Sequence, residues 1–192
     1  FRLMKRDVSS AITFRAIRLL DEGSLRACEG KFLDLEAQER IDMNLDAYLQ
    51  MVSKKTGSLT ACAMALGALL STEDENVLDA FWNCGDNLGV AVQMRTDLRE
   101  LWPRKDEKSA TATEVMNKKK LFPVVYALDK APISVKRRLG DIYFKRVLEL
   151  EDVCRLRNLL EELGVKEECE KLVAVYRTKA IVALKIPCVS SV

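Results

Sequence analysis

Hydrophobic residues recur at steps of three and four along almost the whole chain, and this spacing constrains the fold more than any other feature. Steps of three and four return to one face of an α-helix, whereas a half-buried strand needs strict alternation of apolar and polar residues. No convincing alternation occurs. The 192 residues include only 8 glycines and 4 prolines, so few positions are suited to interrupt a helix. The sequence therefore predicts an all-α fold.

The periodicity also predicts where the helices lie. We expect them over residues 3–37, 45–70, 74–101, 113–129, 133–146, 150–163 and 167–185. Residues 61–70 are apolar around the full circumference of a helix, which favours a position inside a bundle. A chain of this length with 48% hydrophobic residues can build one core, so we interpret residues 1–192 as a single domain.

Charge and composition exclude several classes of function. Lysine and arginine total 31 against 29 aspartates and glutamates, and the net charge of +2 gives no case for a nucleic-acid partner. The chain has no histidine, which excludes Ser–His and Cys–His catalysis and imidazole ligation of metals within it. Hard divalent cations bound by oxygen atoms remain available.

The cysteines and the hydropathy pattern indicate the environment of the protein. Six cysteines lie at positions 28, 62, 84, 154, 169 and 188, without a C-x-x-C pair. We interpret them as reduced packing residues of a cytoplasmic protein. No uninterrupted apolar run approaches the roughly 18 residues that a transmembrane helix needs, so we predict no transmembrane segment.

One predicted helix carries a polar stripe. Gln93, Thr96, Asp97 and Glu100 follow the spacing i, i+3, i+4 and i+7 and share a helical face. Two carboxylates so placed suit a divalent cation and, through it, a phosphate-rich ligand. The small residues at 84–91 would let neighbouring helices approach closely. The alternative is an exposed helix whose acids pair with nearby arginines.

Two basic segments suit phosphate groups. Lys54 and Lys55 precede Thr56 and Gly57, where a glycine can loosen a helix and expose backbone donors beside a hydroxyl group. The triplet 118–120 is three lysines at the start of an apolar run. Each segment taken alone is more typical of a solvated helix face.

In their order and spacing, these segments resemble the trans-prenyltransferases, also called polyprenyl or isoprenyl diphosphate synthases. The family motif L-G-x-A-F-Q-I-x-D-D-x-x-D corresponds to Leu88–Glu100 with substitutions, and E-G-Q-x-x-D-L to Glu29–Leu35. The family's K-T pair corresponds to Lys55-Thr56, and D-L-x-x-G-K-x-T-L-P to Glu114–Pro123. The joint spacing is more specific than any single motif, and it covers nearly the whole chain.

The resemblance implies a helical bundle of the isoprenoid synthase type around a central cavity. It implies condensation of an allylic diphosphate with isopentenyl diphosphate, release of diphosphate, a requirement for Mg²⁺, and a homodimer. Catalytic and substrate-binding roles fall on four residues: Lys55, Thr56, Gln93 and Lys119. Metal-binding roles fall on three: Thr96, Asp97 and Glu100.

The sequence departs from the family at the metal motif, where D-D-x-x-D is replaced by Thr96-Asp97-x-x-Glu100. Threonine is a weaker ligand for a hard cation than a carboxylate. Two other interpretations therefore stay open: a non-catalytic regulatory or partner subunit, and a terpene-cyclase-like enzyme. The chain begins at Phe1 in a helical pattern, so we expect the N-terminal part of the family fold, with its first aspartate-rich motif, to be missing.

Overall fold

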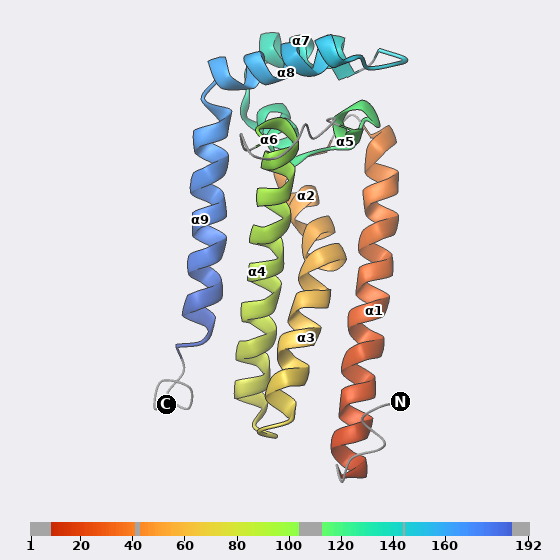
Figure 1. Ribbon diagram of the computed structural model, residues 1–192, viewed down its shortest axis with the longest axis vertical. Helices are drawn as coiled ribbons and strands as arrows, with labels where there is room; N and C mark the ends of the chain where they lie inside the picture. Colours follow the sequence, from red (N-terminus) through yellow and green to blue (C-terminus); the bar gives the residue numbers. More distant parts are fainter. Residues whose placement is uncertain (1–8, 41–42, 104–112, 144, 186–192) are drawn as a thin grey trace. The chain divides into compact units, whose positions relative to one another are not determined.

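The computed structural model describes residues 9–40, 43–103, 113–143 and 145–185 (Figure 1). All regular structure in these ranges is helical, and they contain no strand. The all-α prediction is therefore confirmed. None of the helices in these ranges combines the length and the hydropathy needed to cross a membrane. The part of the first predicted helix before residue 9, the loop at 104–112 and Cys188 lie outside the described residues.

Nine α-helices and one π-helix make up the described chain. In order, they are α1 (Ser10–Glu39), α2 (Leu45–Val52), the π-helix η2 (Ser53–Gly57), α3 (Ser58–Leu69), α4 (Glu75–Leu101), α5 (Thr113–Met116), α6 (Phe122–Lys130), α7 (Ile133–Tyr143), α8 (Leu150–Glu162) and α9 (Val165–Ala183).

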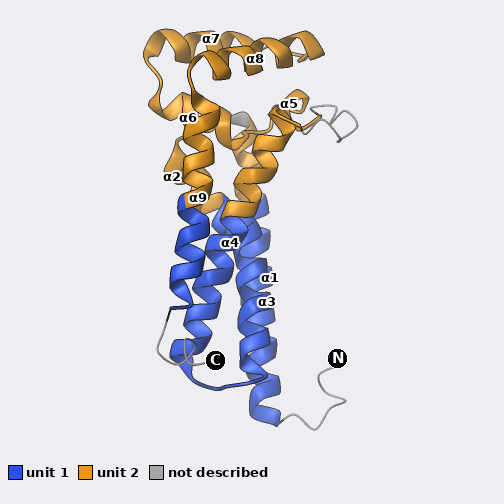
Figure 2. Cartoon of the chain, turned by 60° about the vertical axis from the view of Figure 1, so that its left-hand side comes forward, with its two compact units in different colours: residues 1–31, 52–90, 175–192 blue, residues 32–51, 91–174 orange. Residues whose placement is uncertain are grey.

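The chain divides into two compact units, coloured separately in Figure 2. The first unit comprises residues 1–31, 52–90 and 175–192, and the second comprises residues 32–51 and 91–174. Helices α1 and α4 each contribute residues to both units. The interpretation of the whole chain as one domain stays a prediction.

The predicted continuous helix at 113–129 is wrong, because α5 ends at Met116 and α6 begins at Phe122. Lys118 has a φ of 59°, in the left-handed region that ends helices. The Lys119 N–H donates to the Glu114 carbonyl at 3.0 Å, and the Lys118 N–H donates to the Val115 carbonyl at 2.9 Å. This pair of bonds is a Schellman turn, which satisfies the last carbonyls of α5 and reverses the chain.

Helix α3 is less buried than its sequence predicts. Ala61, Ala65 and Ala68 are buried, but Ala63 and Gly67 are exposed. The buried face joins a core cluster with side chains from α1 and α4: Ala16, Ala68, Leu69 and Leu78. The predicted position of this helix inside a bundle is therefore not seen in the described part of the first unit, where one side of α3 is exposed.

Candidate functional site

The first basic segment lies in a π-helix of the first unit. The Ser58 N–H donates to the Ser53 carbonyl, five residues earlier, so that Lys54 and Lys55 lie in a widened turn. The sequence predicts a loosened helix beside Gly57, and the structure contains it in this form. Single π-turns within α-helices occur frequently at functional sites because they redirect side chains. The segment is half-buried apart from Gly57, which is buried.

Helix α1 packs directly against this π-turn. A Cβ atom at Gly30 would lie 2.2 Å from the Lys55 backbone nitrogen, a distance at which one of the two must move. The neighbouring Glu29 carboxylate accepts a hydrogen bond from the Lys54 ammonium group at 2.9 Å. Two of the four segments that carry the family resemblance, at 29–30 and 54–56, therefore meet within the first unit.

Helix α4 makes a similarly close approach in the same unit. A Cβ atom at Gly89 would lie 2.7 Å from the Gly57 Cα atom and 2.9 Å from the Thr56 carbonyl oxygen. At Gly85 it would lie 2.5 Å from the Ala61 Cα atom. The prediction that small residues in α4 permit close helix packing is confirmed. Lys55 and Thr56 are thus held on a tightly packed backbone rather than on a loose loop.

In the second unit, Asp97 is a buried carboxylate with three hydrogen-bond donors. It is 3% exposed. Its Oδ2 accepts from the Tyr48 hydroxyl at 2.7 Å and from the Phe122 N–H at 3.0 Å, and its Oδ1 accepts from the Gln93 amide at 2.8 Å. Phe122 opens α6, whose own N-cap residue, Leu121, offers no side-chain acceptor. Asp97 therefore caps α6 from another helix and connects it to α2.

Tyr48 is the main partner of this carboxylate. Its side chain is fully buried, and its ring stacks on that of Phe122 with centroids 5.5 Å apart. Burial, followed by the charge and the hydrogen bond of Asp97, raises the pKa of Tyr48 well above its ordinary value. Tyr48 therefore stays protonated and acts as a permanent donor to the carboxylate.

The other two predicted metal ligands have different surroundings. Thr96 is exposed, and its hydroxyl donates to the Val92 carbonyl at 3.0 Å. Glu100 is half-buried; burial and the neighbouring charge of Glu114 raise its pKa, while Lys119 opposes the rise. Within the described ranges, no three carboxylate or thiol groups are arranged to hold a metal ion.

Lys119 lies among these acids. Its ammonium group forms an ion pair with Glu114, and the Tyr143 hydroxyl donates to its backbone carbonyl at 3.1 Å. Burial disfavours its charged form, but the hydrogen bond and charge of Glu114 outweigh that effect and raise the pKa of Lys119. Asp34 and Asp97 add to the rise. Lys119 is therefore a firmly charged cation within an acidic cluster.

The structure brings together part of the predicted site. Gln93, Asp97, Glu100 and Lys119 interact within the second unit. Thr96 belongs to the same helix, whereas Lys55 and Thr56 belong to the first unit. Convergence of the two groups on one cavity stays a prediction.

Sequence reasoning assigned no site role to several members of the acidic cluster and its supports: Asp34, Tyr48, Glu114 and Tyr143. Asp34 and Glu114 occupy acidic positions of the segments that resemble family motifs, and that position was the available signal. The two tyrosines gave none, because a buried aromatic residue on a helix is typical of any core. Their roles follow from the hydrogen bonds that they make.

Comparisons with known proteins agree with this description. The model of the polyprenyl synthetase family matches residues 1–160. A geranylgeranyl diphosphate synthase of Mycobacterium tuberculosis is 33% identical over 167 residues, which are 85% of this chain and 47% of that protein. The chain spans about half the length of the curated relatives it matches.

Solved structures show the same relation. A polyprenyl synthetase from Streptomyces coelicolor is 31% identical with a TM-score of 0.83, covering 91% of this chain and 54% of that one. A polyprenyl synthase from Caulobacter crescentus, complexed with calcium and isoprenyl diphosphate, is 25% identical with a TM-score of 0.79, covering 88% and 52%. Because the family model matches most of the residues and the fold agrees, the chain belongs to the polyprenyl synthetase family.

Proposed function

We propose that the chain carries part of a prenyltransferase site that condenses an allylic diphosphate with isopentenyl diphosphate and releases diphosphate. The observation that supports this most is the electrostatic coupling of Lys119 with Asp97 and Glu100, although these residues are far apart in sequence. Relatives described as geranylgeranyl diphosphate synthases support the same activity. The Caulobacter crescentus complex supports binding of a divalent cation together with an isoprenyl diphosphate.

In this reaction the allylic carbon–oxygen bond breaks and its electron pair leaves with the diphosphate. The double bond of isopentenyl diphosphate attacks the allylic cation, and loss of a proton restores an alkene. Lys119 and Lys55 would stabilise the departing diphosphate by charge, and Thr56 and Gln93 would donate hydrogen bonds to it. No covalent nucleophile is required.

A divalent cation bound with the diphosphate would be stabilised by the acidic cluster, although no three carboxylates or thiols of the described residues form a ligand set by themselves. Burial and a neighbouring carboxylate raise the pKa of Glu100, and a bound cation would relieve that repulsion. Glu100 is therefore the proposed direct ligand, and Thr96 would contribute a lone pair of its hydroxyl oxygen while the hydrogen stays with the Val92 carbonyl. Asp97 would act mainly by holding the start of α6 in place, since its oxygens already accept from three donors. Mg²⁺ would supply positive charge to the leaving diphosphate.

Lys119 would have to exchange partners during binding. Its ammonium group is paired with Glu114, so a diphosphate must displace that carboxylate. A multiply charged anion accompanied by a cation can do so, because phosphate oxygens form stronger ion pairs than a single half-exposed carboxylate. Glu114→Gln should therefore lower the diphosphate concentration needed for half-maximal binding.

The test is diphosphate release by the complete polypeptide across a range of Mg²⁺ concentrations. Thr96→Asp restores an anionic ligand to the stripe and should lower the Mg²⁺ concentration for half-maximal activity by about tenfold. Asn83→Asp adds the same charge at an exposed position of the same helix and should leave it unchanged. No diphosphate release by wild type or Thr96→Asp at any Mg²⁺ concentration would exclude the catalytic proposal.

A second candidate is a non-catalytic regulatory or partner subunit of a prenyl diphosphate synthase. The altered metal motif favours this role, because Thr96 replaces a carboxylate and the remaining aspartate, Asp97, caps α6. A catalytically silent chain that raises the activity of a separate prenyl diphosphate synthase would establish this role. A terpene-cyclase-like enzyme would instead consume an allylic diphosphate without isopentenyl diphosphate.

The proposal includes a homodimer in the cytoplasm. Helix α1 exposes apolar side chains in the first unit, with Phe14 at 64%, Ile17 at 43% and Leu25 at 63% exposure. They recur on one side of the helix, and a second copy would remove them from water. Sedimentation of the complete polypeptide at micromolar concentration should give a dimer, and a monomer would contradict this part of the proposal.

A further inference from the structure

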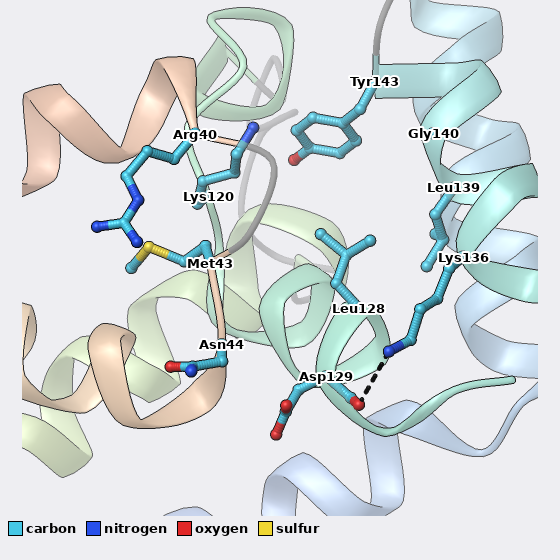
Figure 3. A pocket seen from close by; sticks show the side chains of 10 residues that line it. All are labelled: Arg40, Met43, Asn44, Lys120, Leu128, Asp129, Lys136, Leu139, Gly140 and Tyr143. Carbon is cyan, nitrogen blue, oxygen red and sulfur yellow. Dashed lines mark hydrogen bonds between the residues drawn. The ribbon is translucent and has the colours of Figure 1, made fainter. Parts of the chain in front are cut away.

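A cavity of about 310 Å³ lies in the second unit and contains none of the predicted site residues. Figure 3 shows its lining, which comes from the segment between α1 and α2, from Lys120 just before α6, from the end of α6, and from α7. Its volume is at the lower end of the range of roughly 300–1,000 Å³ that is typical of small-molecule sites. A compact ligand would fill it.

The charges around this cavity are predominantly positive. Arg40, Lys120 and Lys136 line it, and Asp129 is the one acidic side chain among the described lining residues. The Asp129 carboxylate is already paired with Lys130 at 3.0 Å, while Lys136 donates to the Asp129 backbone carbonyl at 3.3 Å. The cavity is thus suited to an anion carrying more than one negative charge.

The remaining lining is largely apolar. Met43, Leu128, Leu139 and the ring of Tyr143 border the space between the cations. In Figure 3, Leu128 lies between the Lys120 and Lys136 side chains, and Leu139 lies beside Lys136 on α7. A ligand that combines a charged head with a short hydrocarbon body would match both kinds of surface.

Lys120 is the lining residue whose burial the packing of the fold explains least. It is 8% exposed, and its ammonium group donates one long hydrogen bond, at 3.4 Å, to the Gln38 carbonyl. It also lies 5.1 Å from the centre of the Tyr143 ring. Among the described residues, no carboxylate forms an ion pair with it. A buried ammonium group without a counter-charge is costly, and that cost is expected where a ligand supplies the missing anion.

We propose that this cavity binds a phosphate ester with a short apolar body, with the charges of Lys120, Arg40 and Lys136 attracting the phosphate and Leu128 and Leu139 contacting the hydrocarbon. The lining includes none of the residues assigned to the proposed transferase site, although Tyr143 both lines the cavity and donates to the Lys119 carbonyl. Phosphate is favoured over carboxylate because three cations line the cavity, and each of them attracts a dianion more strongly than a monoanion.

The Met43 methyl group provides a local reporter of binding. Met43 lines the cavity and is 5% exposed, whereas Met94 is fully buried elsewhere in the second unit. With ¹³C-methyl methionine in the complete polypeptide, isopentyl phosphate should shift the Met43 signal saturably and leave that of Met94 in place. Isopentanol and hexanoate should bind at least about tenfold more weakly, because each lacks the dianionic head.

Two variants and a control assign the binding to the cavity. Lys136→Gln should weaken isopentyl phosphate by about tenfold, and Lys120→Met should abolish most of the Met43 shift. Arg137→Gln removes an exposed cation of α7 that does not line the cavity and should change the affinity little. Lys119→Ala should impair diphosphate release without affecting this binding, so failure of the proposed transferase function and failure of this site give different results.

Stability separates a ligand site from a structural lysine. Methionine keeps the apolar stem of Lys120 and removes its charge, so Lys120→Met should leave the thermal unfolding temperature unchanged or raise it. The proposal would be overturned if Lys120→Met lowered the unfolding temperature and Lys136→Gln left isopentyl phosphate binding intact. Equal effects of Arg137→Gln and Lys136→Gln would also overturn it, as would hexanoate binding as tightly as the phosphate ester. Binding of isopentenyl diphosphate as tight as that of isopentyl phosphate would identify the enzyme's own substrate as one source of the ligand.

Discussion

The basic π-turn of the first unit (residues 53–57) and the acidic stripe of the second (Gln93, Thr96, Asp97 and Glu100) both match motifs of the polyprenyl synthetase family. They differ in what their side chains can bind. In the π-turn, the family residues Lys55 and Thr56 are retained, and Gly30 lets helix α1 pack directly on their backbone. In the stripe, Thr96 replaces a carboxylate, and Asp97 is buried and hydrogen-bonded by three donors.

The difference shows that a residue can match a family motif and still be unavailable to bind a cation. Asp97 matches the motif, yet its hydrogen bonds give it the role of capping α6. Glu100 is a substituted position, yet it is the half-exposed carboxylate that a cation could reach. The predictions below test this division, from the largest expected effect to the smallest.

Asp97→Ala should have the largest effect on stability. It would leave the Tyr48 hydroxyl and the Phe122 N–H without their buried acceptor, which should lower the free energy of unfolding by about 3–5 kcal/mol. Chemical denaturation measures this difference. Thr96→Ala, at the adjacent exposed position, should stay within about 0.5 kcal/mol of wild type. Equal effects of the two variants would show that Asp97 has no special structural role.

Gly30→Ala tests the packing of the basic π-turn. The added Cβ atom would lie 2.2 Å from the Lys55 nitrogen, and the resulting overpacking should cost about 1–3 kcal/mol. Gly67→Ala is the matched control, because no atom lies within 4 Å of its Cβ position. It should stabilise helix α3 by about 0.5–1 kcal/mol. A neutral Gly30→Ala variant in thermal unfolding would contradict the close approach of α1.

Lys118→Gly should stabilise the turn that precedes Lys119. Lys118 has a φ of 59°, and the aligned family motif has glycine at this position. Relief of the left-handed strain, offset by the greater freedom of glycine in the unfolded chain, should add about 0.5–1 kcal/mol. Lys118→Ala keeps the strain and should give no increase in the thermal unfolding temperature. The same increase in both variants would exclude backbone strain as the cause.

Glu100 should give a small pH dependence of stability. Because its pKa is raised above the ordinary value of 4.5, the native state binds more protons than the unfolded state just above that pH. Stability should therefore fall as the pH rises through the raised pKa, and Glu100→Gln should remove this part of the slope. Denaturation of both proteins at closely spaced pH values measures it. A wild-type contribution that rises with pH would contradict the raised pKa.

The helical fold could be predicted from periodicity, since apolar spacing and the scarcity of glycine and proline act locally. The break between α5 and α6 could not, because a left-handed lysine has no periodic signal. The motif residues could be located by resemblance. Their hydrogen-bond partners could not, because Tyr48 and Asp97 are 49 residues apart and only the folded chain brings them together.

The most direct test of the different roles of Glu100 and Asp97 is Mn²⁺ binding in the presence of inorganic diphosphate. The electron paramagnetic resonance signal of free Mn²⁺ measures the binding. In the complete polypeptide, Glu100→Gln should weaken Mn²⁺ binding by about tenfold or more, because it removes the proposed direct ligand. Asp97→Asn should change the Mn²⁺ affinity by less than about threefold while lowering stability, since it perturbs the cap of α6. Loss of Mn²⁺ binding in Asp97→Asn together with wild-type binding in Glu100→Gln would contradict the account.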